Sequence, residues 1–589
     1  MMNNIHTITK DVSGSYWAQP VTPRAQLYLC SPTLDDLLPQ DDEIRLFDAL
    51  LRELDWSGWE NLYPRRRGQP PIHPRLVAGT IIFCLGLGVR SSRGVEETAR
   101  RRIDLIWFLE GRTIDHSTVC AFRKKFADLL PGLFDELARK AARGPQAGRR
   151  LAVDGTRMRA NSDRHGSRTA ASLRRRLGEI AENREALLLE MEQLDAFENI
   201  IAAPEEKDGK ALRKQIETLE AQRNKLERAL ERAGERDAAK QAKDGPGATA
   251  VRVPTSDPDA HLLPNKEGGY APNYTPTIAV DLASGAIIDA QVPDGADEAG
   301  TLAETVQASR RRFGHKPETL LCDGNFATGA TLKNLEQARV AMCSPTAPPV
   351  APAACREDPR QPIDPSRLDD LPTTGRGENK RFTRASFVYD ENQDCYWCPA
   401  GRPLPRAGQE QRREKNGSRP SRRRYQSRSC SDCPLGARCL KGKAKTRSVV
   451  RDEYQPCRDR LASHMERHAS RQLYKKRAPT VEGTFGYIKH VMGVRGFLRR
   501  GRSAVQNEWL WICAAFNVGK ILRRAPRLGP NSPANGPDPS PKAARSRKNA
   551  FTRGFFVHIR PLALFARLGA LILHVQTALA AKHMECVQS

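Results

Sequence analysis

The chain has 589 residues, and its 96 Lys and Arg against 69 Asp and Glu give a formal net charge of +27 at pH 7. Its hydrophobic fraction of 39% excludes a wholly disordered chain, and its length predicts more than one domain. The positive surplus favours a polyanion such as nucleic acid as partner, because Lys and Arg gain affinity by releasing phosphate counterions. Since the first 15 residues lack the apolar core of a secretory signal, we expect a cytoplasmic protein without disulfides.

Residues 41–144 carry apolar side chains at helical spacing, which predicts an all-helical unit. Within it, the apolar segment 103–109 is followed by a second predicted helix that ends near residue 126 and can be N-capped by Asp115 or Ser117. A short helix, a turn and a basic second helix suit a helix-turn-helix, in which Arg123 and Lys124 are candidate DNA contacts. An ordinary helical hairpin with a solvated basic face explains this pattern equally well.

Residues 172–241 are rich in Glu, Arg, Leu and Ala, and their apolar positions follow steps of three, four and seven. Pro204 and Gly209 interrupt the run, so we expect an antiparallel helical hairpin that folds on itself or pairs with a second subunit. We interpret it as a structural insert without chemistry.

Short strands are predicted on both sides of this insert. The apolar run 151–153 ends in Asp154, residues 277–290 favour a β-hairpin, and the run 319–322 ends in Asp323. With a helical segment at 301–312 they predict a mixed α/β sheet, whose strand ends can position ligating groups. We interpret Asp281, which also closes an apolar run, as a structural turn residue.

Two further patterns lie in the C-terminal half of the chain. In the block 474–489, Glu482 and Lys489 fall on one side of a predicted helix, and an apolar helical pattern up to residue 522 can cover the sheet. Before this block, the segment 345–372 looks like a flexible linker. Five cysteines follow that linker, at Cys395, Cys398, Cys430, Cys433 and Cys439.

The first four of these cysteines have the paired form of a tetrahedral zinc site, so their spacing alone selects Cys395 over Cys439. Between the two pairs lies a basic loop that would face DNA if the site folds. Its cationic residues are Arg412, Arg413, Lys415, Arg419 and Arg422 to Arg424.

The motifs around Asp154 and Asp323, the cysteine spacing and the block 474–489 follow one another along the chain. In this order they resemble the DDE transposases of bacterial insertion sequences. The likeness is to the group with a helical N-terminal domain and a cysteine-bearing insert, the insertion-sequence family numbered eleven-eighty-two, and it runs from about residue 41 to 524. It implies an α/β fold with a ribonuclease-H-like catalytic core, an all-helical N-terminal DNA-binding domain, a helical-hairpin insert and a small Cys-rich zinc-binding insert.

The resemblance implies that Asp154, Asp323 and Glu482 form an acidic triad for Mg²⁺ or Mn²⁺. Carboxylates suit these hard ions, and two such ions can stabilise both the attacking and the leaving oxygen when a phosphodiester is displaced in line. A DNA end cut in this way would expose a 3′-hydroxyl that can attack target DNA in a second displacement of the same kind.

Related transposases carry a Tyr-Arg-Glu-Lys signature, which corresponds here to Tyr474, Arg477, Glu482 and Lys489. Four residues rather than three separate the Arg from the Glu. Arg477 and Lys489 are then candidate contacts to the DNA backbone. The family's cysteine pattern maps onto Cys398, Cys430, Cys433 and Cys439 as the zinc ligands and leaves Cys395 as the alternative.

The implied function is a DNA transposase that binds the terminal inverted repeats of an insertion sequence and catalyses metal-dependent strand cleavage and strand transfer. We expect it in the bacterial cytoplasm, at the nucleoid when bound to DNA, without a membrane partner and as a homodimer or larger synaptic complex. A catalytically inactive, transposase-derived DNA-binding regulator and a metal-dependent nuclease without strand transfer are the alternatives.

The predicted domains follow in chain order. They are a helical DNA-binding domain (41–144), a first core segment (150–340) with its helical insert (172–241), a linker and Cys-rich insert (345–450), a second core segment (455–524) and a variable tail (525–589).

Overall fold

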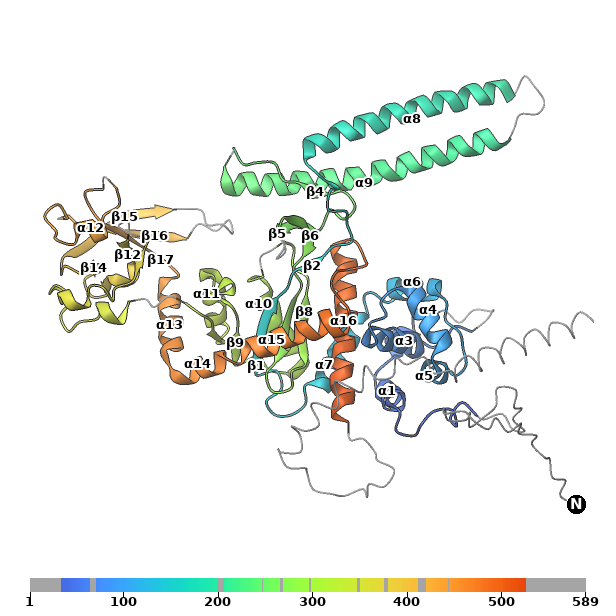
Figure 1. The fold of residues 1–589 in the computed structure, drawn as a ribbon, viewed down its shortest axis with the longest axis horizontal. Helices are drawn as coiled ribbons and strands as arrows, with labels where there is room; N and C mark the ends of the chain where they lie inside the picture. Colours follow the sequence, from blue (N-terminus) through green and yellow to red (C-terminus); the bar gives the residue numbers. More distant parts are fainter. Residues whose placement is uncertain are drawn as a thin grey trace, which may run out of the picture. The chain divides into compact units, whose positions relative to one another are not determined.

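The computed structural model (Figure 1) describes residues 33–63, 70–198, 206–245, 247–264, 268–295, 298–346, 350–375, 380–411, 420–428, 430–442 and 444–525. The chain divides into two compact units. Among described residues, the first comprises 33–45 and 97–113, and the second comprises 46–96 and 114–525. The predicted helix break at Pro204, the basic residues Arg412, Arg413, Lys415 and Arg419, and the tail from residue 526 lie outside the described residues.

The first unit is organised by polar contacts to Asp35. Its carboxylate accepts a hydrogen bond from the Trp107 indole at 2.7 Å and forms an ion pair with Arg45 at 3.0 Å. Trp107 belongs to α5 (Ile103–Phe108). Two helices, α1 (Glu43–Arg52) and α4 (Ser92–Arg101), each contribute residues to both units.

The N-terminal part of the second unit consists of helices joined by turns and loops, without a strand among its described residues up to residue 141. Trp59 stacks on Phe122 and Phe126, with ring centroids 5.7 and 4.9 Å apart, and these rings join two helices. Asp115 caps the second of them, as the sequence predicts, by accepting a hydrogen bond from Thr118 N at 2.6 Å. The complete helices here are α2 (Ser57–Glu60), α3 (Pro74–Gly86), α6 (His116–Lys125) and α7 (Leu130–Ala141).

A five-stranded mixed sheet forms the centre of the second unit, so the predicted α/β fold is confirmed. Its strand order is β10-β9-β1-β7-β8, with β1 antiparallel to β7 and parallel to β9. The helix α10 (Thr301–Phe313) connects β8 to β9, and α16 (Arg502–Arg524) packs against β8 and α7. The strands are β1 (Arg150–Gly155), β7 (Thr277–Asp281), β8 (Ile287–Gln291), β9 (Thr319–Leu321) and β10 (Ala341–Cys343).

Two small sheets continue from the central one. After β1, the chain enters β2 (Met158–Arg159), which pairs with β6 (Tyr270–Tyr274), the strand that leads into β7. β6 also pairs with β5 (His261–Pro264), and β3 (Ser167–Arg168) pairs with β4 (Val253–Pro254).

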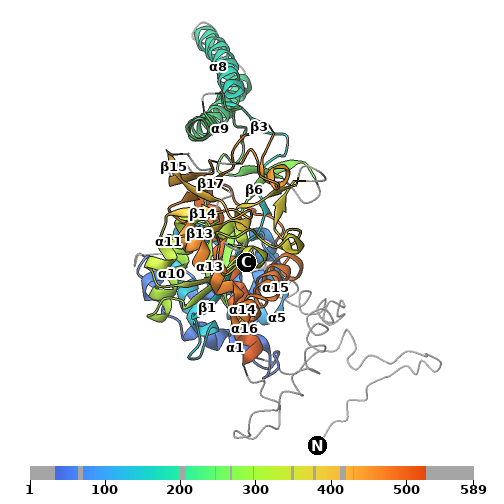
Figure 2. The same ribbon diagram turned by 90° about the vertical axis from the view of Figure 1, so that its left-hand side faces the viewer.

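The long helices α8 (Ala170–Glu198) and α9 (Glu206–Asp244) leave from these small sheets. They lie side by side as an antiparallel hairpin, which Figures 1 and 2 show from two directions. Leu173, Ala229 and Ala233 are fully buried where the two helices pack near their base.

The cysteine-bearing insert has a hydrophobic core of its own, centred on Tyr396 and Tyr425. The segment 345–372 was expected to be a flexible linker, and this prediction is wrong for its described part. Ala354, Ile363 and Leu371 are buried in that core, so the Pro-rich chain wraps the sheet without forming long helices or strands. The insert's sheet runs β13 (Val388–Asp390), β14 (Cys395–Trp397), β15 (Pro403–Gln411), β16 (Ser421–Gln426) and β17 (Ser448–Asp452) in spatial order.

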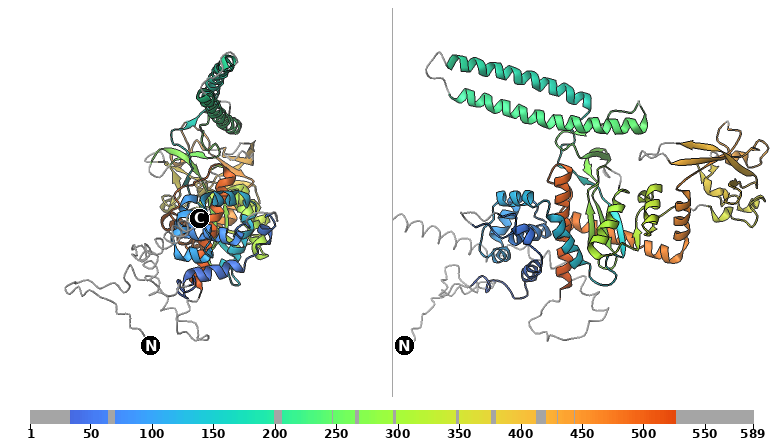
Figure 3. Two further views of the ribbon diagram at one scale, coloured as in Figure 1. Left: turned by 90° about the vertical axis from the view of Figure 1, so that its right-hand side faces the viewer. Right: turned by 180° about the vertical axis from the view of Figure 1, so that it is seen from behind.

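The chain returns from the insert to the central sheet through consecutive helices, which Figure 1 labels and Figure 3 shows in two further views. They are α13 (Gln455–Glu466), α14 (His468–Tyr474), α15 (Arg477–Gly486) and a single π turn, η6 (Tyr487–Val491). α15 packs against β1 and β7 and brings Arg477 and Glu482 to the sheet. Among the described residues, no helix combines the length and hydropathy needed to cross a bilayer.

Candidate functional site

Asp154 stands at the C-terminal end of β1, the middle strand of the central sheet. The three residues before it are at most 1% exposed, so burial of this apolar run fixes where the Asp154 carboxylate emerges. One of its oxygens accepts a hydrogen bond from Gly155 N at 3.0 Å. Asp154 therefore has a rigid backbone and a partly accessible side chain.

Arg477, the first residue of α15, forms an ion pair with Asp154 at 3.0 Å. The exposed fractions of the two side chains are 11% for Arg477 and 18% for Asp154. Burial raises the pKa of Asp154, the Arg477 guanidinium opposes that shift, and the negative charges of Asp323 and Glu482 add to it. The carboxylates of Asp154, Asp323 and Glu482 and the Arg477 guanidinium therefore interact electrostatically at one place.

Asp323 reaches this place from the neighbouring parallel strand. It follows β9, and its carboxylate caps the short helix η1 (Gly324–Phe326) by accepting a hydrogen bond from Asn325 N at 2.8 Å. Because β1 and β9 are parallel and paired, their C-terminal ends meet at the same edge of the sheet. The spacing of Asp154 and Asp323 is thus set by strand pairing.

Glu482 and Lys489 complete this edge. Glu482 is exposed on α15, one and a half turns beyond Arg477. Lys489 donates hydrogen bonds to the Thr156 hydroxyl and to the Arg157 carbonyl oxygen, on the turn that follows Asp154. Tyr474 lies at the end of α14, where burial raises the pKa of its hydroxyl.

Glu298 was missed by the sequence analysis. A β-carbon added to Gly155 would lie 2.3 Å from a carboxylate oxygen of Glu298, so this acid packs directly against the residue after Asp154. Its only sequence signal is the acidic stretch that precedes α10. We call the five residues Asp154, Asp323, Glu482, Arg477 and Glu298 the acidic edge.

The acidic edge is not arranged as a finished metal site. Among the described residues, no group of three or more His, Cys, Asp or Glu side chains is placed to hold a metal ion. At Asp154, the counter-charge is the Arg477 guanidinium.

Asp281 shows how a structural aspartate differs. Its fully buried carboxylate accepts hydrogen bonds from Ser284 N and Oγ and from Gly148 N, at 2.6–3.1 Å. These donors satisfy the carboxylate within its own turn and the adjacent chain, which agrees with its interpretation as a turn residue.

The two candidate DNA contacts on α6 have different environments. Lys124 is exposed, whereas Arg123 donates to the Arg90 carbonyl oxygen and lines a small cavity that also contains Arg499 and Glu508. Burial lowers the pKa of the Arg123 guanidinium. Arg123 therefore packs towards the interior, which suits neither a DNA contact nor the solvated basic face of the alternative interpretation, whereas Lys124 remains exposed.

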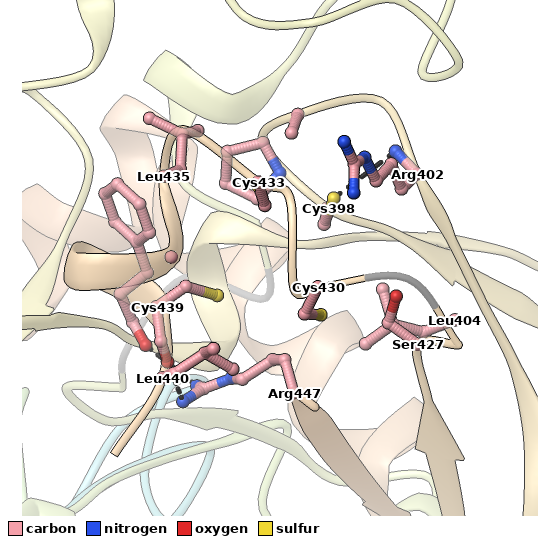
Figure 4. A pocket seen from close by; sticks show the side chains of 14 residues that line it. Cys398, Arg402, Leu404, Ser427, Cys430, Cys433, Leu435, Cys439, Leu440 and Arg447 are labelled. Carbon is pink, nitrogen blue, oxygen red and sulfur yellow. Dashed lines mark hydrogen bonds between the residues drawn. The ribbon is translucent and has the colours of Figure 1, made fainter. Parts of the chain in front are cut away.

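Four cysteines surround one small cavity in the insert (Figure 4). The cavity of about 20 Å³ is lined by Cys398, Cys430, Cys433 and Cys439, and Cys395 is not among its lining residues. The lining thus contains the four cysteines that the family pattern selects, although among the described residues no three of them are placed to hold a metal ion.

Burial controls the acidity of these thiols. It raises the pKa of Cys398 and raises that of Cys439 to about 12, and the neighbouring sulfurs add to both shifts. A backbone N–H of Arg402 donates to the Cys398 sulfur at 3.3 Å and favours its thiolate. We call these four residues the thiol cavity.

Comparison with known proteins gives two matches to protein families. Residues 397–522 match the model described as "Transposase DDE domain", and residues 32–125 match the model described as "Transposase domain (DUF772)". No curated protein and no solved structure matches the chain. The first match contains the thiol cavity, Arg477, Glu482 and Lys489, and together the two matches support a DDE transposase.

Proposed function

We propose that this protein is a DNA transposase that binds the terminal inverted repeats of an insertion sequence and catalyses strand cleavage and strand transfer through a ribonuclease-H-like core. The observation that carries the proposal is the convergence of Asp154, Asp323 and Glu482 at one sheet edge, from segments more than 150 residues apart. The sheet order supports it. On one side of β1 lie the antiparallel strands β7 and β8, and on its other side lie β9, which is parallel to β1, and then β10. Assignment to the insertion-sequence family numbered eleven-eighty-two is part of the proposal.

The donor set fits a hard divalent cation. Asp154, Asp323 and Glu482 offer only oxygen ligands. Burial raises the pKa of Asp154 and the charges of Asp323 and Glu482 add to that shift, so a cation is electrostatically favoured there. Mg²⁺ or Mn²⁺ held by these three residues would activate a water or hydroxyl nucleophile and stabilise charge on the phosphate oxygens.

The chain's own basic residues are arranged to position DNA at this edge. Lys489 is anchored on the turn after Asp154, and Arg477 faces the same carboxylate. Both can contact phosphates of a bound strand, which fixes the register of the DNA without reading its sequence. Lys124 is exposed on α6 and is a further candidate contact.

We propose that the thiol cavity holds a structural zinc ion through Cys398, Cys430, Cys433 and Cys439. Four sulfur ligands suit tetrahedral zinc, and the backbone N–H bond to Cys398 is of the kind that stabilises a ligating thiolate. Such an ion would join two loops of the insert and leave no position open for chemistry.

The test of the proposed function is the Asp154→Asn variant with end DNA in the presence of Mg²⁺ or Mn²⁺. We expect cleavage to fall by roughly 10³-fold or more, because a lost metal ligand removes several kcal/mol of transition-state stabilisation. The matched control is Asp370→Asn, which changes an exposed carboxylate on the insert. Undiminished cleavage by Asp154→Asn would contradict the triad.

The same assay separates the two alternatives. A nuclease would release cut ends that never join target DNA. A regulator would bind the ends and leave them uncut even when the wild-type triad is present. Assembly of a dimer or larger complex on two ends can be followed by sizing the protein with and without end DNA.

A further inference from the structure

A large cavity lies at the base of the helical hairpin, which we first interpreted as a structural insert without chemistry. Its volume is about 590 Å³, and its walls come from α9, from β3, β5 and the first residue of β6, and from the loops beside them. Cationic and histidine side chains dominate the lining: Arg164, His165, Arg236, Lys240, Arg252 and His261. No Asp or Glu occurs among the described residues that line it.

Two arginines of this basic cavity are held by backbone carbonyl oxygens. Arg236 donates to the carbonyl oxygens of Ala260 and Asp259 at 2.9 and 2.8 Å, and Arg252 donates to that of Ser167 at 2.9 Å. Carbonyl groups orient a guanidinium without neutralising it. Outside the lining, Asp294 pairs with His261 at 3.2 Å and acts with Asp259 on Arg236, so Arg164, Lys240 and Arg252 carry most of the positive charge of the cavity.

Arg164 is held in place by shape rather than by charge. Its guanidinium lies over Gly269, where a β-carbon would be 2.3 Å from a guanidinium nitrogen, and the positive φ of 71° at Gly269 also favours glycine. Arg164 is exposed and, among the described residues, has no ion-pair partner.

Two uncharged groups complete the basic cavity. Ser167 is 3% exposed, and its buried hydroxyl has no hydrogen-bond partner among the described residues. Tyr270 is the most exposed of the large hydrophobic side chains described, at 63%, and presents its ring at the cavity. A cavity with these walls does not suit an apolar small molecule, which needs mainly hydrophobic lining.

The basic cavity is linked to the acidic edge through two strands. β2 begins four residues after Asp154, and β6, which starts with Tyr270, ends three residues before β7. Met158 pairs with Tyr274 across these strands, so the small sheet is a continuation of the strands beside Asp154. A polyanion that enters the acidic edge can therefore extend towards the cavity.

We propose that the basic cavity binds the sugar–phosphate backbone of DNA next to the cleavage site. Its cations pair with phosphates, the Ser167 hydroxyl donates to a phosphate oxygen, and the Tyr270 ring packs against a sugar or base. The inference rests on the proposed function in one respect, that DNA is the substrate. It gives the base of the hairpin a direct role in substrate binding.

The test is DNA binding by the full chain without metal, in EDTA, over a series of salt concentrations. The cavity variant is Arg164→Glu with Arg252→Glu, and the matched control is Arg174→Glu with Arg310→Glu, which makes the same charge change at exposed sites outside the cavity. For the cavity variant we expect the slope of log K against log salt to fall by about 2, and affinity at 0.1 M salt to fall by roughly 50-fold or more.

Equal losses in the two variants would overturn the proposal, since general charge would then explain binding. A cavity variant that changes only the oligomeric state would also overturn it. A photo-cross-linking phenylalanine in place of Tyr270 should attach to the DNA, whereas the same residue in place of exposed Leu189 on α8 should not. Because no step requires cleavage, a failure of the triad experiment leaves this result readable, and the reverse also holds.

Discussion

The acidic edge and the thiol cavity are both candidate metal sites, and they are built in opposite ways. The acidic edge draws its residues from β1, the end of β9 and α15, and a protein cation, Arg477, already pairs with Asp154. The thiol cavity draws all four residues from one insert with its own core and is nearly filled by them. This difference leads us to expect that Mg²⁺ or Mn²⁺ binds the acidic edge together with DNA, and that zinc stays bound in the thiol cavity as part of the folded insert.

Zinc binding by the insert is the first test of this difference between the two sites. We expect purified wild-type protein to carry about one zinc per chain, and Cys430→Ser to lose it and unfold the insert. The effect should be the largest of the stability changes considered, because structural zinc contributes on the order of 10 kcal/mol of binding free energy to folding. Metal analysis and limited proteolysis of the purified variants measure both quantities.

Cys395→Ser is the matched control. Cys395 is buried in the same insert but does not line the cavity, so this variant should keep its zinc. Loss of zinc from Cys395→Ser together with retention by Cys439→Ser would show that the sequence spacing, not the thiol cavity, identifies the fourth ligand.

Replacing Arg477 tests the other site. Arg477→Met leaves the Asp154 carboxylate without its cation and should cost about 3 kcal/mol of unfolding free energy in EDTA, the lower end for a buried pair because Asp154 retains some exposure. Lys476→Met removes an exposed charge one residue earlier and should cost less than about 0.5 kcal/mol.

Added Mn²⁺ sharpens the same experiment. If the guanidinium and the metal compete for the carboxylates, Mn²⁺ should stabilise Arg477→Met more than wild type, because a ligand that binds the folded state stabilises it in proportion to its affinity. Denaturant unfolding with and without Mn²⁺ measures this. An identical Mn²⁺ response in the two proteins would contradict the competition.

The two sites also differ in how far sequence could predict them. Runs 151–153 and 320–322 are short, apolar and buried, so the strands and the acids that follow them were predictable. The Arg477–Asp154 pair joins residues more than 300 positions apart, and nothing local to either signals that contact. Glu298 was missed for the same reason, since its place against Gly155 depends on how the chain returns from β8.

The insert shows a second limit of prediction from sequence, in a segment whose local pattern was misleading. Its Pro-rich segment reads as a linker because proline breaks regular structure, yet Ala354, Ile363 and Leu371 bury their side chains along an irregular path. Residue spacing favours Cys395 as the fourth cysteine, and the family resemblance favours Cys439. In the structure, Cys439 ends the short helix α12 (Gly436–Cys439) at the cavity, whereas Cys395 belongs to β14 and does not line it.

Proton release gives the most sensitive contrast between the two sites. Metal ligation requires thiolates, and burial raises the pKa of Cys398 and brings that of Cys439 to about 12, so these thiols are protonated at pH 7 in the zinc-free protein. Zinc uptake should therefore release at least the protons of Cys398 and Cys439, and zinc affinity should rise between pH 6 and pH 8. Carboxyl groups ordinarily ionise near pH 4, and although burial raises the pKa of Asp154, Mn²⁺ binding at the acidic edge should release fewer protons than zinc binding.

Calorimetric titration in two buffers of different ionisation enthalpy measures the protons released by each metal. The zinc-binding enthalpy should change strongly with the buffer, and the Mn²⁺ enthalpy should change less. Because the folded-state pKa of these thiols is raised, the neutral form favours the metal-free fold at low pH, and that advantage is lost as the pH rises towards the raised values. A zinc-binding enthalpy that does not depend on the buffer would mean that the thiol cavity does not ligate zinc. It would also contradict the proposed difference between a zinc ion that stays bound and a Mn²⁺ ion that exchanges.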